Sequence, residues 1–249
     1  REAAERGHPY GWTNLALCYL KGDGVPKSPK RAFECFVKAA ELGHARAKLR
    51  VACCLLDGRG VKRDLRGGSE LLHQLAHGDD DACYELAERR FKGIGLVKHA
   101  PYAVAWLRYG ARTGFASCQV YLGAHLHNVV RTPRARREAV RWYRSAARSG
   151  LPHACANLFQ SYRDGEGVPQ NDRRALFWLK RAVELNEDPL CDEVNELAFV
   201  ELAKRHITGD GVFRDRRRAR RLLEKAVAEG SKRAAKLLAT LRPRASSRR

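Results

Sequence analysis

Residues 163–172 read Arg-Asp-Gly-Glu-Gly-Val-Pro-Gln-Asn-Asp, and this stretch decides how the whole sequence is interpreted. Two glycines around one acidic residue are compatible with a loop that holds a phosphate or with a bend between two helices. The form Gly-x-Gly followed by Val or Leu recurs, with its first glycine at Gly22, Gly58, Gly93, Gly165 and Gly209. These glycines are 36, 35, 72 and 44 residues apart. The interval of 72 is two periods, so a copy near Val129 has lost its glycines, and the interval of 44 indicates an insertion of about eight residues.

A second glycine marker has the same period. Small residues followed by glycine end the units at Gly43, Gly78, Gly114 and Gly150, and the series continues with Gly7, Asn186 and Gly230. A fixed period of roughly 20–50 residues is typical of a solenoid, in which one unit cannot bury its apolar face until others stack on it. Recurrence therefore favours a bend over a phosphate loop, because a fold does not need five phosphate sites at one period.

Each unit is predicted to contain two helices joined by the bend. The first helix has apolar residues at helical spacing, as at Leu158, Phe159 and Tyr162. An N-cap residue three positions after the Val of the bend begins the second helix, at Ser28, Asp64, Asn171 and Asp215. The second helices share a small residue, at Ala32, Ala103, Ala139, Ala175 and Ala219, and a bulky one at Trp106, Trp142, Trp178 and Leu222. The small residues let the helices approach, and the bulky residue fills the gap to the neighbouring unit.

These residues resemble the Sel-one-like repeat family, which is related to the tetratricopeptide repeats. The family pattern is Leu-Gly-x-x-Tyr-x-x-Gly-x-Gly-Val, then Asp, then Ala-x-x-Trp-x-x-Lys-Ala-Ala-x-x-Gly, and residues 158–168 and 175–182 are similar to it. The resemblance covers about residues 1–230. It implies an all-α fold, a right-handed superhelical α/α solenoid of about six two-helix repeats. The fourth repeat departs from the pattern, since it lacks both bend glycines and the expected N-cap.

The two markers give the expected boundaries. We expect the end of a preceding repeat at residues 1–7, and repeats 1, 2 and 3 at 8–43, 44–78 and 79–114. Repeat 4, with its degenerate bend, is expected at 115–150, repeat 5 at 151–186, and repeat 6, with the insertion, at 187–230. A closing helix at 231–241 and a basic disordered tail at 242–249 are expected to follow.

The charge of the chain favours polyanionic neighbours. The formal net charge is +20 over 249 residues, of which residues 115–150 contribute +6 and residues 231–249 contribute +7. Such an excess is typical of proteins that contact RNA, an anionic membrane surface or an acidic protein. A basic surface that only keeps the chain soluble has the same composition.

The eight cysteines and the chain ends bear on the compartment. No two cysteines form a Cys-x-x-Cys pair, and most occupy positions where other repeats have Ala, which favours reduced structural thiols over a disulfide framework. An intracellular compartment, the cytoplasm or an organelle such as the mitochondrion, is therefore favoured over secretion. No window of about 18 uncharged apolar residues occurs, so no membrane span is expected. The chain begins with Arg1 and contains no Met, which indicates a processed protein or an excerpt of a longer one.

The sequence does not predict an enzyme, a metal site or a bound cofactor. The bends lack the third glycine of a dinucleotide fingerprint and follow a helix, and no P-loop motif occurs. His73 and His77 have the i, i+4 spacing of a zinc site but lack the Glu of a zinc protease, so solvated or edge histidines are the preferred interpretation. No nucleophile elbow or kinase motif is present.

Protein binding is the function that the resemblance implies, because the known members of the family are mostly adaptors. In helical-hairpin solenoids the first helices line the concave face. The position eight residues before the first bend glycine is predicted to point away from the packed residues and to contact an extended or helical peptide there. It holds Asn14, Arg50, Glu85, Tyr121, Asn157 and Glu201. The alternative is that these side chains are merely solvated.

A second set of residues favours a polyanion. Arg131, Arg134, Arg136 and Arg137 surround the degenerate bend, and Arg141 and Arg144 extend along the second helix of repeat 4. Arg242, Arg244, Arg248 and Arg249 lie in the tail. The leading hypothesis is thus a scaffold within a multi-protein complex, the alternative is an RNA-contacting subunit of a large ribonucleoprotein such as an organellar ribosome, and a third is a secreted cysteine-bridged repeat protein.

Overall fold

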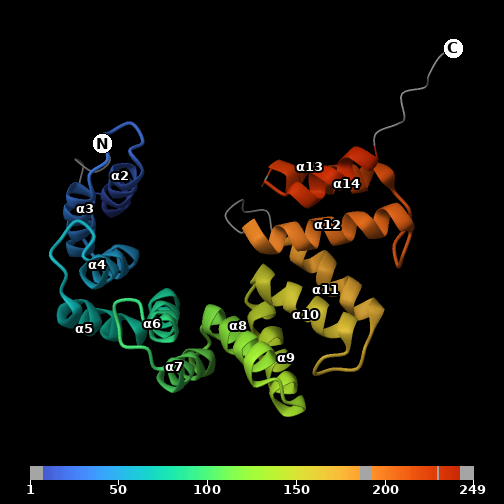
Figure 1. Cartoon of the computed structure of the whole chain (residues 1–249), viewed down its shortest axis with the longest axis horizontal. Helices are drawn as coiled ribbons and strands as arrows, with labels where there is room; N and C mark the ends of the chain where they lie inside the picture. Colours follow the sequence, from blue (N-terminus) through green and yellow to red (C-terminus); the bar gives the residue numbers. More distant parts are fainter. Residues whose placement is uncertain (1–7, 186–191, 229, 242–249) are drawn as a thin grey trace. The chain divides into compact units, whose positions relative to one another are not determined.

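The computed structural model describes residues 8–185, 192–228 and 230–241, and within these ranges it contains thirteen α-helices, one π-helical segment and no strand (Figure 1). The chain divides into two compact units, which we call unit 1 (residues 1–118) and unit 2 (residues 119–249).

Unit 1 is an alternation of first and second helices. The first helices are α2 (Pro9–Lys21), α4 (Ala45–Asp57) and α6 (Asp80–Lys92). The second helices are α3 (Pro29–Glu41), α5 (Leu65–Ala76) and α7 (Ala100–Thr113), and each packs on the first helix before it. In Figure 1 the first helices line one side of this unit and the second helices the other. Helix α8 (Ala116–His125) begins in unit 1 and continues into unit 2.

Unit 2 repeats the alternation and adds a closing helix. It contains the π-helical segment η1 (Leu126–Val130), α9 (Pro133–Arg148), α10 (Pro152–Asp164), α11 (Asp172–Glu184), α12 (Asp192–Thr208), α13 (Arg216–Ala228) and α14 (Lys232–Thr240). Helix α13 packs against both α12 and α14. Helix α14 lies where the sequence predicts a closing helix. The predicted tail at 242–249 and part of the insertion, residues 186–191, lie outside the described residues.

The predicted helix caps are present in the regular bends. The side chains of Ser28, Asp64 and Asn171 each accept a hydrogen bond from the backbone N–H three residues later, and Asp215 accepts from the N–H groups of Arg217 and Arg218. His99 plays the same part in repeat 3, with its ring nitrogen accepting from the N–H of Tyr102 at 3.0 Å. The first glycine of each regular bend ends the preceding helix in the left-handed region, with φ between 69° and 86°. The spacing of the bends predicts each of these caps except His99.

In the bends of repeats 2 and 5, the second glycine is required by packing as well as by its dihedral angle. A Cβ atom on Gly60 would lie 2.1 Å from the backbone oxygen of Pro29, and one on Gly167 would lie 2.4 Å from that of Arg136. Both contacts are with the beginning of the second helix of the preceding repeat. Only glycine lets the two backbones approach so closely, so this residue fixes how one repeat sits on the next.

The core is built on the shared alanine column. Ala32, Ala103, Ala139, Ala175 and Ala219 are all at most 1% exposed. The tryptophans are only half-buried, whereas the largest fully buried side chains are Phe36, Phe159 and Phe199. Trp106 nevertheless fills the gap to the neighbouring repeat as predicted, because its ring lies 5.9 Å from that of His73 and 5.1 Å from that of His77, centroid to centroid. These two histidines therefore contact aromatic rings.

The bend of repeat 4 differs from the prediction. Helix α8 continues into η1, and Arg131 then adopts the left-handed conformation with φ 57°. Thr132 accepts a hydrogen bond from the N–H of Ala135 at 3.1 Å and caps α9. The expectation that repeat 4 has lost its N-cap was wrong, because the cap lies three residues earlier than the regular spacing. The missing glycines are replaced by a wider helical turn and one strained arginine.

Two further expectations concern membranes and thiols. Among the described helices, none is both long enough and apolar enough to cross a bilayer. Seven cysteines are described and all seven are free, while Cys191 lies outside the described residues.

Candidate functional site

Three first helices of unit 1 present a repeated pattern of side chains. Each has an i, i+4, i+7 triplet, which places three residues on one side of a helix. We call these nine residues the first-helix face of unit 1. They are Tyr10, Asn14 and Leu17 on α2, Arg46, Arg50 and Cys53 on α4, and Asp81, Glu85 and Glu88 on α6.

The chemical character of this face changes from helix to helix. On α2 it is neutral, with Tyr10 70% exposed and Leu17 37% exposed on either side of the exposed Asn14. On α4 it is basic, because Arg46 and Arg50 are both exposed. On α6 it is acidic at the exposed Asp81, whereas the half-buried Glu85 and Glu88 form ion pairs with Arg89 and Lys92 of the same helix.

Hydrogen bonds between neighbouring repeats hold the three helices in a row. Thr13 of α2 shares a hydrogen bond of 2.9 Å with the ring of His44, the residue that precedes α4. Cys53 of α4 donates to Glu85 of α6 with Sγ and Oε1 3.7 Å apart. These bonds link α2 to the start of repeat 2 and α4 to α6 within unit 1.

A buried arginine lies behind the acidic stretch. Arg89 is 6% exposed, and its guanidinium contacts both carboxylate oxygens of Asp57 at 2.7 and 3.2 Å and Glu85 at 2.7 Å. Hydrogen bonding to Arg89 holds the pKa of Asp57 below its ordinary value. Burial raises the pKa of Cys53 to about 12, so this thiol is not a nucleophile near neutral pH. Glu85, predicted to contact a partner, is thus oriented by Arg89 within the chain.

The other three predicted partner-binding residues lie on the first helices of unit 2. Tyr121 on α8 is 43% exposed, and Asn157 on α10 is half-buried. Glu201 on α12 is half-buried and lies 3.8 Å from both Lys204 and Arg205. Asn14, Arg50 and Glu85 therefore share one face within unit 1, and Tyr121, Asn157 and Glu201 occupy the corresponding position of unit 2.

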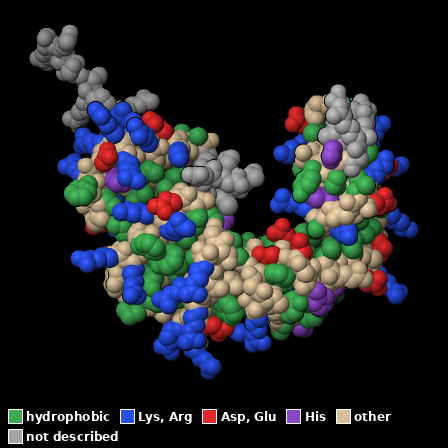
Figure 2. Space-filling model, turned by 180° about the vertical axis from the view of Figure 1, so that it is seen from behind, with side chains coloured by type: hydrophobic (Ala, Val, Ile, Leu, Met, Phe, Trp, Pro, Cys, Tyr) green, Lys and Arg blue, Asp and Glu red, His purple; other side chains and the backbone are tan. Residues whose placement is uncertain are grey.

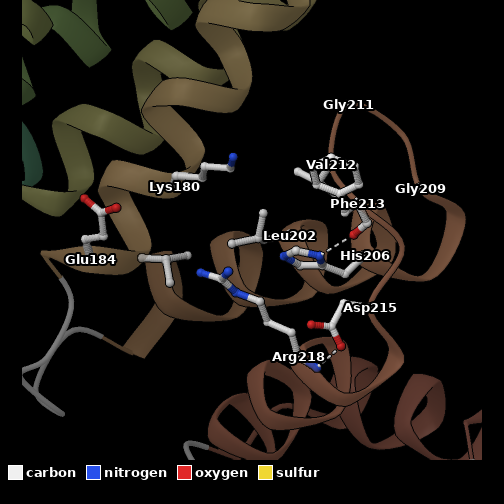
Figure 3. A pocket seen from close by; sticks show the side chains of 11 residues that line it. Lys180, Glu184, Leu202, His206, Gly209, Gly211, Val212, Phe213, Asp215 and Arg218 are labelled. Atoms are coloured by element: carbon white, nitrogen blue, oxygen red, sulfur yellow. Dashed lines mark hydrogen bonds between the residues drawn. The ribbon is translucent and has the colours of Figure 1, made fainter.

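Unit 2 contains a pocket of about 680 Å³ among α11, α12, α13 and the last bend (Figure 3). Its walls are apolar at Val183, Leu202 and Val212, and Phe213 at its edge is 95% exposed. The ring of His206 is 6% exposed, and Figure 3 shows its Nδ1 bonded to the backbone oxygen of Phe213 at 3.0 Å. That bond fixes the ring against the bend.

The charged side chains that line the pocket are two cations, Lys180 and Arg218, and two carboxylates, Glu184 and Asp215. Asp215 accepts hydrogen bonds from two backbone N–H groups, and Glu184 lies 3.5 Å from Arg181. Lys180 and Arg218 also line the pocket, and within the described residues neither forms an ion pair. Among the described residues, no group of three His, Cys, Asp or Glu side chains is arranged to hold a metal ion.

The structure separates the predicted polyanion-binding arginines into two groups. Arg131, Arg134, Arg137 and Arg141 are exposed. Two others are engaged within the chain, since Arg136 lies 3.1 Å from Glu166 and Arg144 donates to the hydroxyl of Tyr162 at 2.6 Å. The tail arginines Arg242, Arg244, Arg248 and Arg249 lie outside the described residues.

Helix α13 and the end of the bend before it carry a cluster of basic residues that the charge of the whole repeat does not indicate. Six of the eight residues from Arg214 to Arg221 are arginine, and all six are exposed. The net charge of the whole segment 187–230 is nevertheless −1, because acidic residues near its beginning offset these arginines. Net charge summed over a window shorter than one repeat reveals the cluster. Figure 2 shows Lys and Arg side chains gathered on the part of the molecule near the C-terminus.

Comparison with known proteins agrees with this architecture. The model of the Sel1 repeat family matches residues 13–44, 45–80, 80–115, 116–151, 152–187 and 200–231. A Sel1 repeat protein from Oxalobacter formigenes is 26% identical, with 89% of this chain and 88% of that chain covered and a TM-score of 0.65. An immunity protein from Pseudomonas aeruginosa, 20% identical, shares the fold, with coverages of 76% and 72% and a TM-score of 0.56.

A longer protein is similar as well. A protective antigen present in uropathogenic Escherichia coli strains, which displays the SLR fold, is 25% identical with a TM-score of 0.66. The match covers 96% of this chain and 50% of that one, so this chain spans about half the length of that protein. The expectation of an all-α repeat fold with about six repeats is confirmed. Six matches at the period of the bends show that the chain belongs to the Sel1 repeat family.

Proposed function

We propose that the chain is a non-catalytic adaptor subunit of a multi-protein complex and that it binds a partner protein on the first-helix face of unit 1. Sel1 repeats imply a protein-interaction scaffold in general. The observation that carries the finer proposal is the change along this face from neutral to basic to acidic. A surface that served only solubility would not need this order.

The order of charges selects a partner. A binding segment would place acidic side chains opposite Arg46 and Arg50, and basic side chains opposite the carboxylates of α6. Complementary charge of this kind fixes register and excludes wrong partners more than it adds affinity. The affinity would come from apolar contact, for which Tyr10 and Leu17 on α2 are exposed.

The pocket of unit 2 supplies a second anchoring place. Its volume is within the range of pockets that bind small molecules or single large side chains. Val183, Leu202 and Val212 would contact an apolar side chain of a partner, and Lys180 and Arg218 would favour a neighbouring acidic residue. A partner that engaged both units would gain avidity from two weak contacts.

The test is charge reversal on α4. We expect the double variant Arg46→Glu and Arg50→Glu to lose specific protein partners in co-purification from the native source, quantified against the wild type. The matched control is Lys27→Glu with Lys62→Glu, which makes the same change of charge at exposed positions of the bends. The triple variant Asn14→Ala, Arg50→Ala and Asn157→Ala tests the predicted set in both units.

Two outcomes would contradict the proposal. One is that the α4 variant, folded by circular dichroism, retains every partner that the wild type binds. The other is that the control variant loses the same partners to the same extent, because net charge rather than this face would then be responsible. The alternative of an RNA-contacting subunit depends on different residues, on the second helices of unit 2.

A further inference from the structure

The second helices of the two units differ at equivalent positions. Two residues before and two residues after the shared small residue of each second helix, the side chains are exposed in α5, α9 and α13. In α5 of unit 1 the small residue is Gly68, and these positions hold Arg66 and Glu70, which form an ion pair at 3.0 Å. In α9 they hold Arg137 and Arg141, and in α13 they hold Arg217 and Arg221.

Like charges at this spacing oppose helix formation. An i, i+4 pair of opposite charge stabilises a helix by roughly 0.2–0.5 kcal/mol, and a pair of like charge destabilises it by a similar amount. Unit 2 therefore contains two unfavourable pairs where α5 of unit 1 has a favourable one. Within the described residues, none of these four arginines forms an ion pair.

The backbone conformation of Arg131 is a second feature that lowers the stability of unit 2. It is the one residue other than glycine with positive φ in the described part of the chain. A left-handed conformation costs a residue with a side chain roughly 1–2 kcal/mol, and glycine avoids most of that cost. Arg131 is exposed and forms no ion pair with described residues, so nothing within the chain explains why arginine occupies this position.

A bound polyanion would explain why the chain keeps both the like-charged arginine pairs and an arginine at the left-handed position 131. Phosphate groups would neutralise the like-charged pairs and would form an ion pair with the Arg131 side chain. We call the following seven exposed residues the arginine surface of unit 2: Arg131, Arg134, Arg137, Arg141, Arg173, Arg217 and Arg221. Arg173 is the residue of α11 equivalent to Arg137 and Arg217. All seven are arginine rather than lysine, and the guanidinium fork suits bidentate contact with phosphate.

One aromatic residue favours RNA among the polyanions. Phe177 of α11 is 59% exposed and stands at the position equivalent to Arg141 and Arg221. Its ring lies 5.1 Å from that of Trp178, centroid to centroid. The equivalent positions of α9 and α13 hold arginine, so in the register of the repeats the ring stands between cations. A single exposed ring between cations suits a base stacked on it with phosphates on either side.

We propose that the arginine surface of unit 2 binds single-stranded RNA through its phosphates, with Phe177 stacking on a base. This proposal goes beyond the adaptor function, since it uses other residues and another class of partner. It requires no sequence recognition, because phosphates and stacking do not read base edges.

The experiment measures binding of a fluorescein-labelled mixed-sequence RNA of about 20 nucleotides to the whole chain across a salt series. If four to seven arginines contact phosphate, the slope of log K against log salt should be roughly −3 to −5. The variant with Arg137, Arg141, Arg217 and Arg221 all changed to Gln should flatten the slope by roughly 3. The control changes Lys21, Lys27, Lys30 and Lys62, four exposed lysines of unit 1, to Gln and should leave the slope nearly unchanged.

Phe177→Ala separates RNA from other polyanions. It should weaken RNA binding roughly tenfold at every salt concentration without changing the slope. Vesicles of equimolar phosphatidylcholine and phosphatidylserine, and poly-L-glutamate, should bind more weakly than the RNA and should not respond to Phe177→Ala. Circular dichroism and thermal melts verify that each variant is folded.

Four results would overturn the proposal. Equal loss of RNA binding in the arginine variant and in the lysine control would show that only net charge matters. Full RNA affinity in the arginine variant would exclude these residues. Stronger binding to the vesicles or to poly-L-glutamate than to RNA, or full RNA affinity after Phe177→Ala, would assign the surface to another class of partner.

Discussion

The bends of repeats 4 and 5 make the same connection with different residues. In repeat 5, Gly165 and Gly167 take left-handed conformations and Asn171 caps α11. In repeat 4 the connection is made by η1, Arg131 and Thr132. The two bends also meet, since Glu166 lies between His127 of η1 and Arg136 of α9. The regular bend therefore helps to hold the irregular one in place.

The comparison shows what glycine loss makes possible. A regular bend is short and its conformation is determined by two glycines, so it offers few positions for other side chains. The irregular bend begins α9 three residues earlier than the regular spacing and places four exposed arginines in and after the turn. Its position is secured by contacts with Glu166 of the next repeat in addition to the Thr132 cap.

The largest expected effect comes from closing the space at the second glycine. Gly167→Ala adds a Cβ only 2.4 Å from the backbone oxygen of Arg136, at a position with φ 76°. We expect a loss of roughly 2–5 kcal/mol in the free energy of unfolding, from strain and overpacking together. Gly165→Ala is the control, since its φ is 72° but its nearest neighbour would be at an ordinary 3.5 Å, and it should cost roughly 1–2 kcal/mol. Urea unfolding measures both, and equal losses would refute the role of the contact.

A smaller effect is expected at the ion pair between repeats 2 and 3. Asp57→Asn should lower the free energy of unfolding by roughly 1–3 kcal/mol at neutral pH, because Arg89 is buried and loses a charged partner. The pKa of Asp57 is lowered in the folded chain, so its contribution is present above the ordinary value of 3.8 and is lost as the pH falls through the folded value.

The free energy of unfolding, measured as the pH is lowered, tests this contribution of Asp57. The wild type should lose more stability than Asp57→Asn as the pH falls below about 5. Parallel acid limbs for the two proteins would show that Asp57 contributes nothing through its ionisation.

The link between the two bends should have a comparable or smaller effect. Glu166→Gln removes the negative charge that His127 and Arg136 share, and it should cost roughly 1 kcal/mol. The control is Glu184→Gln, whose 3.5 Å pair with Arg181 is exposed and should contribute less than about 0.5 kcal/mol. Thermal unfolding at low and high salt compares them, and the same small change in both would mean that the bends do not depend on each other.

The smallest expected effect is a gain. Arg131→Gly relieves the left-handed strain but adds freedom to the unfolded chain, so the net increase in stability should be roughly 0.5–1 kcal/mol. Arg131→Ala removes the same side chain without relieving the backbone and should not stabilise. A destabilised Arg131→Gly variant would show that the arginine has a structural role and would remove one reason for the RNA proposal.

Much of the fold could be predicted from the sequence because the residues that begin and end its helices act locally. The glycines of the bends, the caps at Ser28, Asp64 and Asn171, and the alanine column depend on residues within one repeat or its neighbour. The bend of repeat 4 could not be predicted, because a π-helical turn has no residue signature and Thr132 caps out of register. The contact that holds it comes from Glu166, 34 residues after Thr132.

The candidate sites were predicted less completely. Register identified one equivalent position on each first helix, but it could not show that Arg89 orients Glu85 or that the faces of α2, α4 and α6 differ in charge. The arginines of repeat 4 were found by counting, yet Arg136 and Arg144 turned out to bind within the chain. Such partners depend on packing between repeats, which a sequence pattern does not give.

One measurement tests most directly the central claim that two faces serve two partners. The whole chain is co-purified from its native source as wild type, as Arg46→Glu with Arg50→Glu, and as the variant with Arg137, Arg141, Arg217 and Arg221 changed to Gln, and bound protein and RNA are quantified together. We predict that the first variant loses protein partners and keeps RNA, and that the second loses RNA and keeps the proteins. Loss of both partners in both variants, or of neither, would contradict the account.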